Sequence, residues 1–130
     1  MASIIRSGEY TADTSYEPPL VIGFGIDSRT VERPPAAMGK TVVPPGGRNQ
    51  AHFHARSDAC IFVISGSLRF TIGDPHDDPA VHVAHAGDFV HVPRGEIHGT
   101  ENVSDTDEAH LVFCYPGVAD KEAAETIFVE

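Results

Sequence analysis

Short apolar stretches alternate along the chain with Gly, Pro and Asp residues, and none of them is long enough for an extended helix. Such a pattern is typical of strands in all-β sandwiches and barrels. A polar hairpin connection is expected at GDPHDDPA, residues 73–80. One helical turn is predicted at 119–124. The pattern predicts strands at 19–26, 38–43, 59–64, 67–72, 80–85, 88–92 and 109–115.

The length and charge of the chain limit its architecture and its partners. With 130 residues, we expect one domain, 1–130, that buries roughly two thirds of its unfolded surface without disulfide bonds. Nine Lys and Arg residues stand against nineteen Asp and Glu, which gives a formal charge of −10. This charge repels polyanions, so we expect no nucleic-acid partner.

The expected compartment follows from the N-terminus and the cysteines. No stretch approaches the roughly 18 apolar residues of a membrane span, and the N-terminus lacks the apolar stretch of a signal peptide. Cys60 and Cys114 lie within apolar stretches and form no spaced framework. We therefore expect a cytoplasmic protein, without membrane contact, whose two cysteines are buried free thiols.

Two histidine-containing segments carry the candidate chemistry. His52 and His54 lie two residues apart in GGRNQAHFHARSDACIFVISG, residues 46–66. Because side chains alternate along a strand, both imidazoles would face the same way. They can share a metal ion only if another element supplies a further ligand. His98, in GDFVHVPRGEIHGTEN at 87–102, is the candidate for that ligand.

These segments resemble the paired motifs of the cupin superfamily. The resemblance spans about residues 40–115 and implies a double-stranded β-helix, or jelly-roll barrel. It also implies that His52, His54 and His98 bind one divalent metal ion, which could be Fe, Zn, Ni or Mn. The matching positions are Gly46, His52, His54 and Gly66 in the first segment, and Gly87, Pro93, Gly95, His98 and Asn102 in the second.

The first segment departs from the family pattern where a Glu ligand is usual. Counting back from Gly66 places Ala59 there, whereas counting forward from His54 places Asp58 there. Asp58 is thus a possible fourth ligand, and His91 and His110 are less favoured candidates. The following residues are apolar in both registers, so the pattern does not decide between them. Because Gly66 anchors the strand, we favour Ala59 facing the ion and a site of three histidines.

The resemblance also predicts what surrounds the ion. Arg48 and Gln50 precede the histidines and could reach a substrate oxygen, so Arg48 joins Asp58 as a candidate catalytic residue. The rest of the pocket is expected to be mostly apolar. Its predicted lining is Lys40, Val42, Ile61, Val63 and either Leu111 or Val112.

Three classes of function remain open for such a site. Three imidazoles leave coordination positions free, which favours a catalytic ion over a structural one. The resemblance implies a small-molecule substrate and an iron-type dioxygenase of an enolisable or aromatic compound. One alternative is a redox-neutral cyclase or isomerase with Zn, Ni or Mn, similar to the small cupin cyclases of polyketide pathways. The other is a cupin that binds a small molecule without converting it.

One apolar segment lies outside both motifs. PPLVIGFGI, residues 18–26, predicts an N-terminal strand that would be prone to aggregation if its edge were exposed. We therefore expect a homodimer in which this strand packs against the partner.

Overall fold

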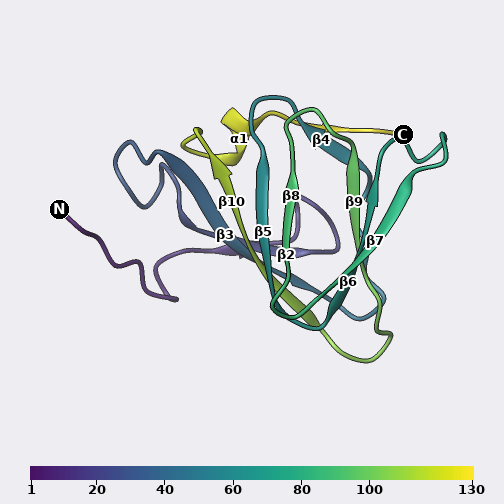
Figure 1. The fold of residues 1–130 in the computed structure, drawn as a ribbon. Coiled ribbons are helices and arrows are strands. Elements are labelled where there is room, and N and C mark those ends of the chain that lie inside the picture. The colour runs from purple at the N-terminus through teal and green to yellow at the C-terminus, as the bar shows by residue number, and fades with distance from the viewer.

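Eleven strands form two antiparallel sheets that face each other in the computed structural model, which describes residues 1–130 (Figure 1). The arrangement confirms the predicted all-β jelly roll. One short helix, α1 (Lys121–Ala124), precedes the last strand. In spatial order, the first sheet contains β1 (Ala12–Asp13), β2 (Val21–Ile26), β3 (Ala36–Val43), β10 (Ala109–Pro116), β5 (Ala59–Ser65) and β8 (Phe89–Val92). The second contains β11 (Thr126–Phe128), β4 (His52–His54), β9 (His98–Asn102), β6 (Ser67–Ile72) and β7 (Ala80–His85).

All seven strands predicted from the apolar stretches are present, as β2, β3, β5, β6, β7, β8 and β10. The strand expected at the first histidine pair is β4, and the predicted helical turn contains α1. The prediction did not include β1, β9 or β11. These strands are too short or too polar to form an apolar stretch, and they are held by pairing with their neighbours.

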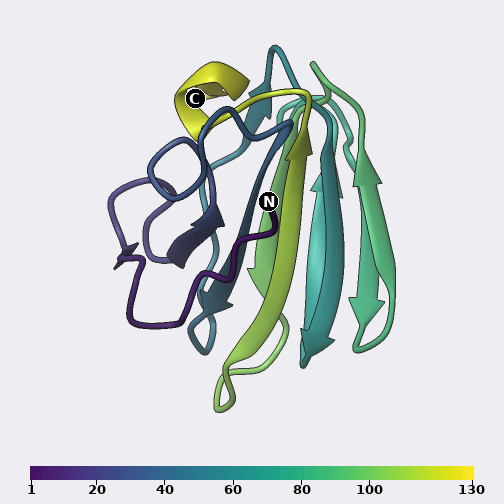
Figure 2. The same cartoon turned by 90° about the vertical axis from the view of Figure 1, so that its left-hand side faces the viewer.

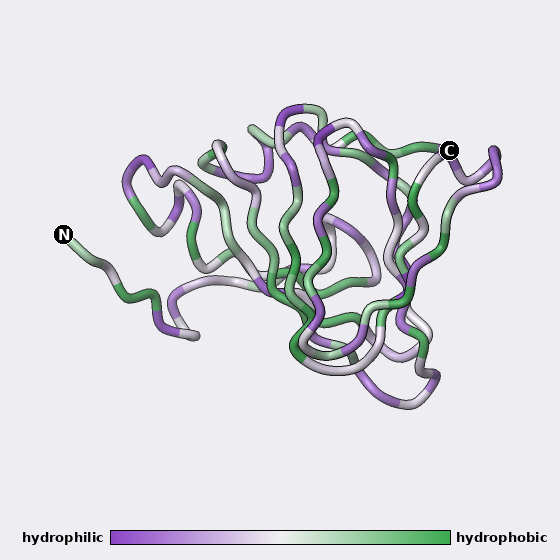
Figure 3. Tube along the Cα trace, in the orientation of Figure 1, coloured by the Kyte–Doolittle hydropathy of each residue, from purple (hydrophilic) through white to green (hydrophobic).

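The hydrophobic core lies between the two sheets. The apolar segments follow the strands, whereas polar residues gather in the connecting loops (Figure 3). Phe24 and Phe113 pack edge to face, with ring centroids 5.2 Å apart. Leu68 and Phe70 of β6 are almost completely buried and supply the core from the opposite sheet. Burial of each such side chain contributes roughly 1.5–3 kcal/mol.

The register of β5 confirms that Ala59 faces the interior. Ala59 and Val63 are buried, whereas Cys60 and Ile64 point to the opposite face and are exposed. The alternation along a strand therefore turns Asp58, which precedes Ala59, away from the interior.

The register predicted for β3 is wrong by one residue. Thr41 and Val43 are buried, whereas Lys40 is exposed and Val42 is only half-buried. Apolar residues occur on both faces of this strand, so hydrophobicity did not show which face is inside. The register is set by pairing with β2 and β10.

The prediction of two buried cysteines is also wrong. Cys60 is exposed and Cys114 is half-buried, and they lie opposite each other in the pairing of β5 with β10. Figure 2 views the molecule from the side of this sheet. The outer face of the sheet is itself partly apolar, with Met38 and Phe89 exposed on it. An apolar sequence context therefore did not imply burial.

The apolar N-terminal segment forms β2, and β1 covers only Ile22 and Gly23 of its outer edge. β1 pairs with one side of it and β3 with the other, and Ile22 and Phe24 are buried. The homodimer stays a prediction. Among the helices, none has both the length and the apolar character needed to cross a membrane.

Two residues of the histidine motifs shape loops at one end of the sheets. Gly66 joins β5 to β6 with φ +81°, and a Cβ there would lie 2.8 Å from the Cβ of Ala109, so only glycine fits. Asn102 is buried at the end of β9. Its Nδ2 lies within 3.1 Å of the carbonyl oxygen of Val43 and 2.8 Å of that of Asp107, and its Oδ1 accepts from the Ser104 amide. One side chain thus joins three backbone segments.

We predict that Asn102→Ala lowers the free energy of unfolding by about 2–4 kcal/mol, because it leaves several buried backbone groups without partners. Urea unfolding followed by circular dichroism measures this loss. Val103→Ala, at the exposed neighbouring position, is the control and should change stability by less than about 1 kcal/mol. Equal effects of the two substitutions would contradict this role of Asn102.

Candidate metal centre

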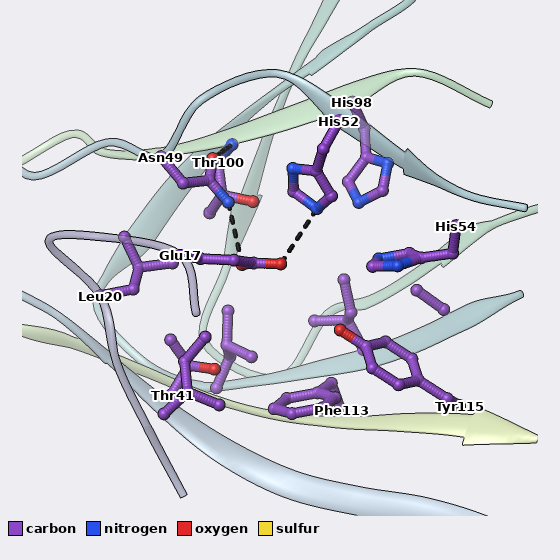
Figure 4. A pocket seen from close by; sticks show the side chains of 14 residues that line it. Glu17, Leu20, Thr41, Asn49, His52, His54, His98, Thr100, Phe113 and Tyr115 are labelled. Atoms are coloured by element: carbon purple, nitrogen blue, oxygen red, sulfur yellow. Dashed lines mark hydrogen bonds and ion pairs between the residues drawn. The ribbon is translucent and has the colours of Figure 1, made fainter. Parts of the chain in front are cut away.

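Three histidines converge between the sheets (Figure 4). β4 carries His52 and His54 with both side chains buried, and β9 begins with His98, which lies directly opposite His52. One ring nitrogen of each histidine lies within 4.8 Å of the others. The structure thus brings together the three residues that the sequence predicted as ligands.

The orientation of each imidazole is fixed by a partner on its Nδ1 atom. Nδ1 of His52 lies 2.9 Å from the Gln50 carbonyl oxygen, and Nδ1 of His98 lies 3.0 Å from that of Glu96. Because a carbonyl only accepts, these Nδ1 atoms donate, which leaves Nε2 as the nitrogen that can bind an ion once it carries no proton. Nδ1 of His54 lies 2.9 Å from Oγ1 of Thr126. Such partners are typical of histidines that bind metals through the other nitrogen.

A carboxylate that the sequence analysis did not identify faces these rings. Glu17, in the segment between β1 and β2, is buried, and its Oε1 lies 3.1 Å from Nε2 of His52. Asn49 Nδ2 donates to the other carboxylate oxygen at 3.1 Å. Glu17 lies outside both histidine segments, and nothing in its local sequence distinguishes it from a surface acid. Its position is produced by tertiary packing.

Burial and the nearby charges set the protonation of the cluster. Burial, followed by the charge of His52, lowers the pKa of His54 to about 3 and that of His98 to about 4. Burial opposes protonation of His52 too, but the hydrogen bond and charge of Glu17 outweigh it and raise the His52 pKa. Burial favours a neutral Glu17, but the contact with His52 lowers its pKa. At neutral pH His54 and His98 are therefore uncharged, whereas the Glu17 carboxylate favours the protonated form of His52.

The groups surround a small cavity with polar and apolar walls. Its volume is about 40 Å³, which is room for only a few water molecules. Ala59, Ile61 and Leu111 form part of the apolar wall. Tyr115 contributes a hydroxyl group (Figure 4). Burial raises the Tyr115 pKa, so this hydroxyl keeps its proton.

The predicted lining is confirmed for Ile61 and Leu111 but not for the other positions. Val63 is buried in the core without reaching the cavity, and Val112 is on the opposite face of β10 from Leu111. Lys40 and Val42 are replaced by Thr41, as the register of β3 requires.

Two of the proposed fourth ligands lie together outside the cavity. Asp58 Oδ2 is 2.9 Å from Nε2 of His91, and Asp58 Oδ1 accepts from the Arg94 amide at 3.0 Å. The hydrogen bond with His91 is the main reason why the Asp58 pKa is lowered. Neither residue lines the histidine cavity, because Asp58 precedes the inward-facing Ala59 and His91 lies opposite the outward-facing Cys60.

The remaining candidates have other partners and do not line the cavity. His110 lies 3.4 Å from a carboxylate oxygen of Glu108, and Arg48 lies 4.0 Å from one of Glu101. The Arg48 side chain is 77% exposed, as expected for a solvated arginine. The structure does not place either residue at the cavity wall.

The family was identified from a model of the cupin domain, which matches residues 39–115. The chain belongs to the cupin family. The matched range contains both histidine segments, so the resemblance deduced from them is confirmed, whereas Glu17 lies outside it. A search among curated proteins found no match to this cupin.

Solved structures with the same fold differ in their described activities. An oxalate oxidase superposes with a TM-score of 0.72 at 25% identity, over 92% of this cupin and 59% of that chain. Oxalate decarboxylase from Bacillus subtilis gives 0.78 at 16% identity, over 99% and 33%. Peruvianin-I, described as a cysteine peptidase from Thevetia peruviana latex, gives 0.69 at 19% identity, over 90% and 72%. This cupin therefore spans 59% of the oxidase and 33% of the decarboxylase.

We predict that Thr126→Val destabilises the protein by about 1–3 kcal/mol, because it removes the hydroxyl that contacts both His54 Nδ1 and, at 2.7 Å, the hydroxyl of Tyr16. Thermal and urea unfolding measure the change. Thr71→Val, at a half-buried position of β6, is the control. A loss no greater than in the control would show that Thr126 does not hold the His54 ring.

Proposed function

We propose that this cupin is a metal-dependent enzyme that uses dioxygen to oxidise a small, enolisable organic compound. The observation that carries the proposal is the convergence of three buried imidazoles whose Nδ1 atoms all have partners. Their remaining nitrogens and one carboxylate oxygen point into the same cavity (Figure 4). Such a cluster of electron-pair donors is suited to a divalent cation.

The donor set fits a catalytic ion better than a structural one. Structural zinc sites usually include cysteine among their ligands. Cys60 and Cys114 lie on the outer face of the first sheet and therefore do not contribute ligands to this site. His52, His54 and His98 would hold the ion and leave positions for small ligands. A divalent ion bound there would supply Lewis acidity toward a substrate oxygen and, if redox-active, a site for dioxygen.

The protein itself would bind and orient the substrate. Tyr115 presents a protonated hydroxyl that can donate a hydrogen bond to a substrate oxygen. Ala59, Ile61 and Leu111 would exclude water from the reacting groups. A cavity of about 40 Å³ is much smaller than the roughly 150 Å³ that accommodates benzene in an apolar cavity. The size therefore favours a substrate of a few heavy atoms over an aromatic one.

The comparison with oxalate oxidase supports the use of dioxygen. That protein is described as an oxalate oxidase, and its fold matches at 25% identity. The decarboxylase from Bacillus subtilis is described as having Mn(II) centres. Both descriptions concern the neighbours, and they are consistent with a metal-dependent reaction of a compact substrate here.

One observation favours a second candidate, a redox-neutral isomerase or cyclase. Glu17 is a buried carboxylate at the cavity, where it could accept a proton from a carbon next to a carbonyl group. Oxygen consumption separates the candidates. Substrate-dependent uptake of dioxygen supports the oxidising enzyme, whereas turnover without uptake supports the isomerase or cyclase. Binding without turnover of any of a panel of small enolisable acids and ketones would favour a non-catalytic cupin.

We predict that the protein binds one equivalent of a divalent metal and that His54→Ala or His98→Ala weakens binding by more than about 100-fold, because even the loss of a group that only supports a ligand costs roughly 10–100-fold. The measurements are metal analysis of the purified protein and titration of the metal-free protein with Mn²⁺ or Zn²⁺.

His82→Ala is the matched control, because His82 is exposed on β7 and lies outside the cavity. It should bind metal as the unchanged protein does. Stoichiometric binding that survives both cavity substitutions would place the metal elsewhere, and absence of binding to the unchanged protein would overturn the proposed function.

A further inference from the structure

We propose that Glu17 is a fourth ligand of the same ion, so that the N-terminal segment supplies the carboxylate that the first histidine segment lacks. The inference rests on the proposed function, specifically on metal binding by His52, His54 and His98. It assigns to the residues before β2 a direct part in the metal site.

The distance between the two groups is that of neighbouring ligands on one ion. Oε1 of Glu17 and Nε2 of His52 are 3.1 Å apart. Two atoms bound to one ion at about 2.1 Å lie about 3.0 Å apart in octahedral geometry and about 3.4 Å apart in tetrahedral geometry. The two groups are therefore already spaced as adjacent ligands.

The carboxylate is also held in a fixed orientation. Asn49 Nδ2 donates to Oε2 of Glu17, and Oδ1 of Asn49 accepts from the Thr100 amide at 2.8 Å. The contact with Thr100 fixes which end of the amide faces Glu17, and the donated hydrogen bond leaves Oε1 directed at the histidines (Figure 4). Thr100 belongs to β9, the strand that carries His98, so one network positions both groups.

Ala59 explains why the carboxylate can come from elsewhere. It lines the same cavity as Glu17, at the position where the family pattern usually has a Glu. Its methyl group leaves space that a longer side chain would fill. Glu17 reaches the cavity from a different part of the chain, ahead of β2. It therefore supplies the same kind of ligand, a carboxylate, from a different position in the sequence.

A structural ion pair between Glu17 and His52 is the competing explanation, and metal affinity distinguishes the two. Glu17→Gln keeps the size of the side chain and one acceptor oxygen, but replaces the other oxygen with an NH2 group and removes the charge. If Glu17 is a ligand, this substitution lowers affinity for Mn²⁺ or Zn²⁺ by at least about 10-fold. If the pair is only structural, the substitution changes the stability of the metal-free protein and leaves the affinity unchanged.

The experiment titrates metal-free unchanged protein, Glu17→Gln and Glu9→Gln against a chelating dye. It also records the absorption spectrum of the Co²⁺ form, which reports the ligand set independently of activity. Glu9 is an exposed acid of the same N-terminal segment that contacts only the Arg6 backbone. We expect weaker binding and an altered Co²⁺ spectrum for Glu17→Gln, and neither change for Glu9→Gln.

Moving the carboxylate back provides the decisive variant. Glu17→Ala should bind metal weakly, and adding Ala59→Glu in the same protein should restore affinity, because the second carboxylate then occupies the space vacated by the first. Should Glu17→Gln fail to fold, Glu17→Asp keeps the charge near His52 and shortens its reach, with weaker binding expected.

The outcomes separate this inference from the proposed function. Suppose that the unchanged protein binds one equivalent of metal. If Glu17→Gln (or Glu17→Asp in its place) then binds metal with the same affinity and the same Co²⁺ spectrum, Glu17 is not a ligand, and the three-histidine site stands. If the unchanged protein binds no metal, both are overturned.

Discussion

The pairing of His52 with His98 is the contact on which the rest of the site depends. β4 contains only three residues and meets β9 at this one registered pair. The loop before β4 continues the alignment, since the Asn49 amide donates to the Thr100 carbonyl and the Asn102 amide to that of Gly47. β11 pairs with the other side of β4 and brings Thr126 opposite His54. A very short strand is thus fixed from both sides.

The second constraint is electrostatic, because three imidazoles and a carboxylate are buried together, away from solvent. Leaving a carboxylate in such surroundings is costly unless it is paired and hydrogen-bonded. Glu17 satisfies this requirement through Asn49 and His52, and every buried side-chain polar atom in the structure has a partner. A cation bound among these groups would balance the negative charge directly. The fold therefore keeps a carboxylate and three imidazoles buried together, although burying them is unfavourable, and this arrangement is suited to binding a cation.

The sequence determined those parts of the site that depend on local spacing. The interval between His52 and His54 fixed their common face, and counting back from Gly66 placed Ala59 inward, because one strand connects them. Glu17 could not be predicted, since its approach to His52 depends on how the segment before β2 packs against β4. The outward position of Cys60 could not be predicted either, because the outer face of its sheet is also apolar and hydrophobicity does not tell the two faces apart.

Fold alone does not determine the activity, since structures described as an oxalate oxidase, a decarboxylase and a cysteine peptidase share it. The site of this cupin combines a small cavity with an acid that enters it from outside the matched residues 39–115. If that acid binds the ion, metal binding and docking of the N-terminal segment are linked, because a ligand stabilises the conformation that binds it. The segment would then close the cavity most firmly when the ion is bound, and the ion would have all of its protein ligands only when the segment is docked.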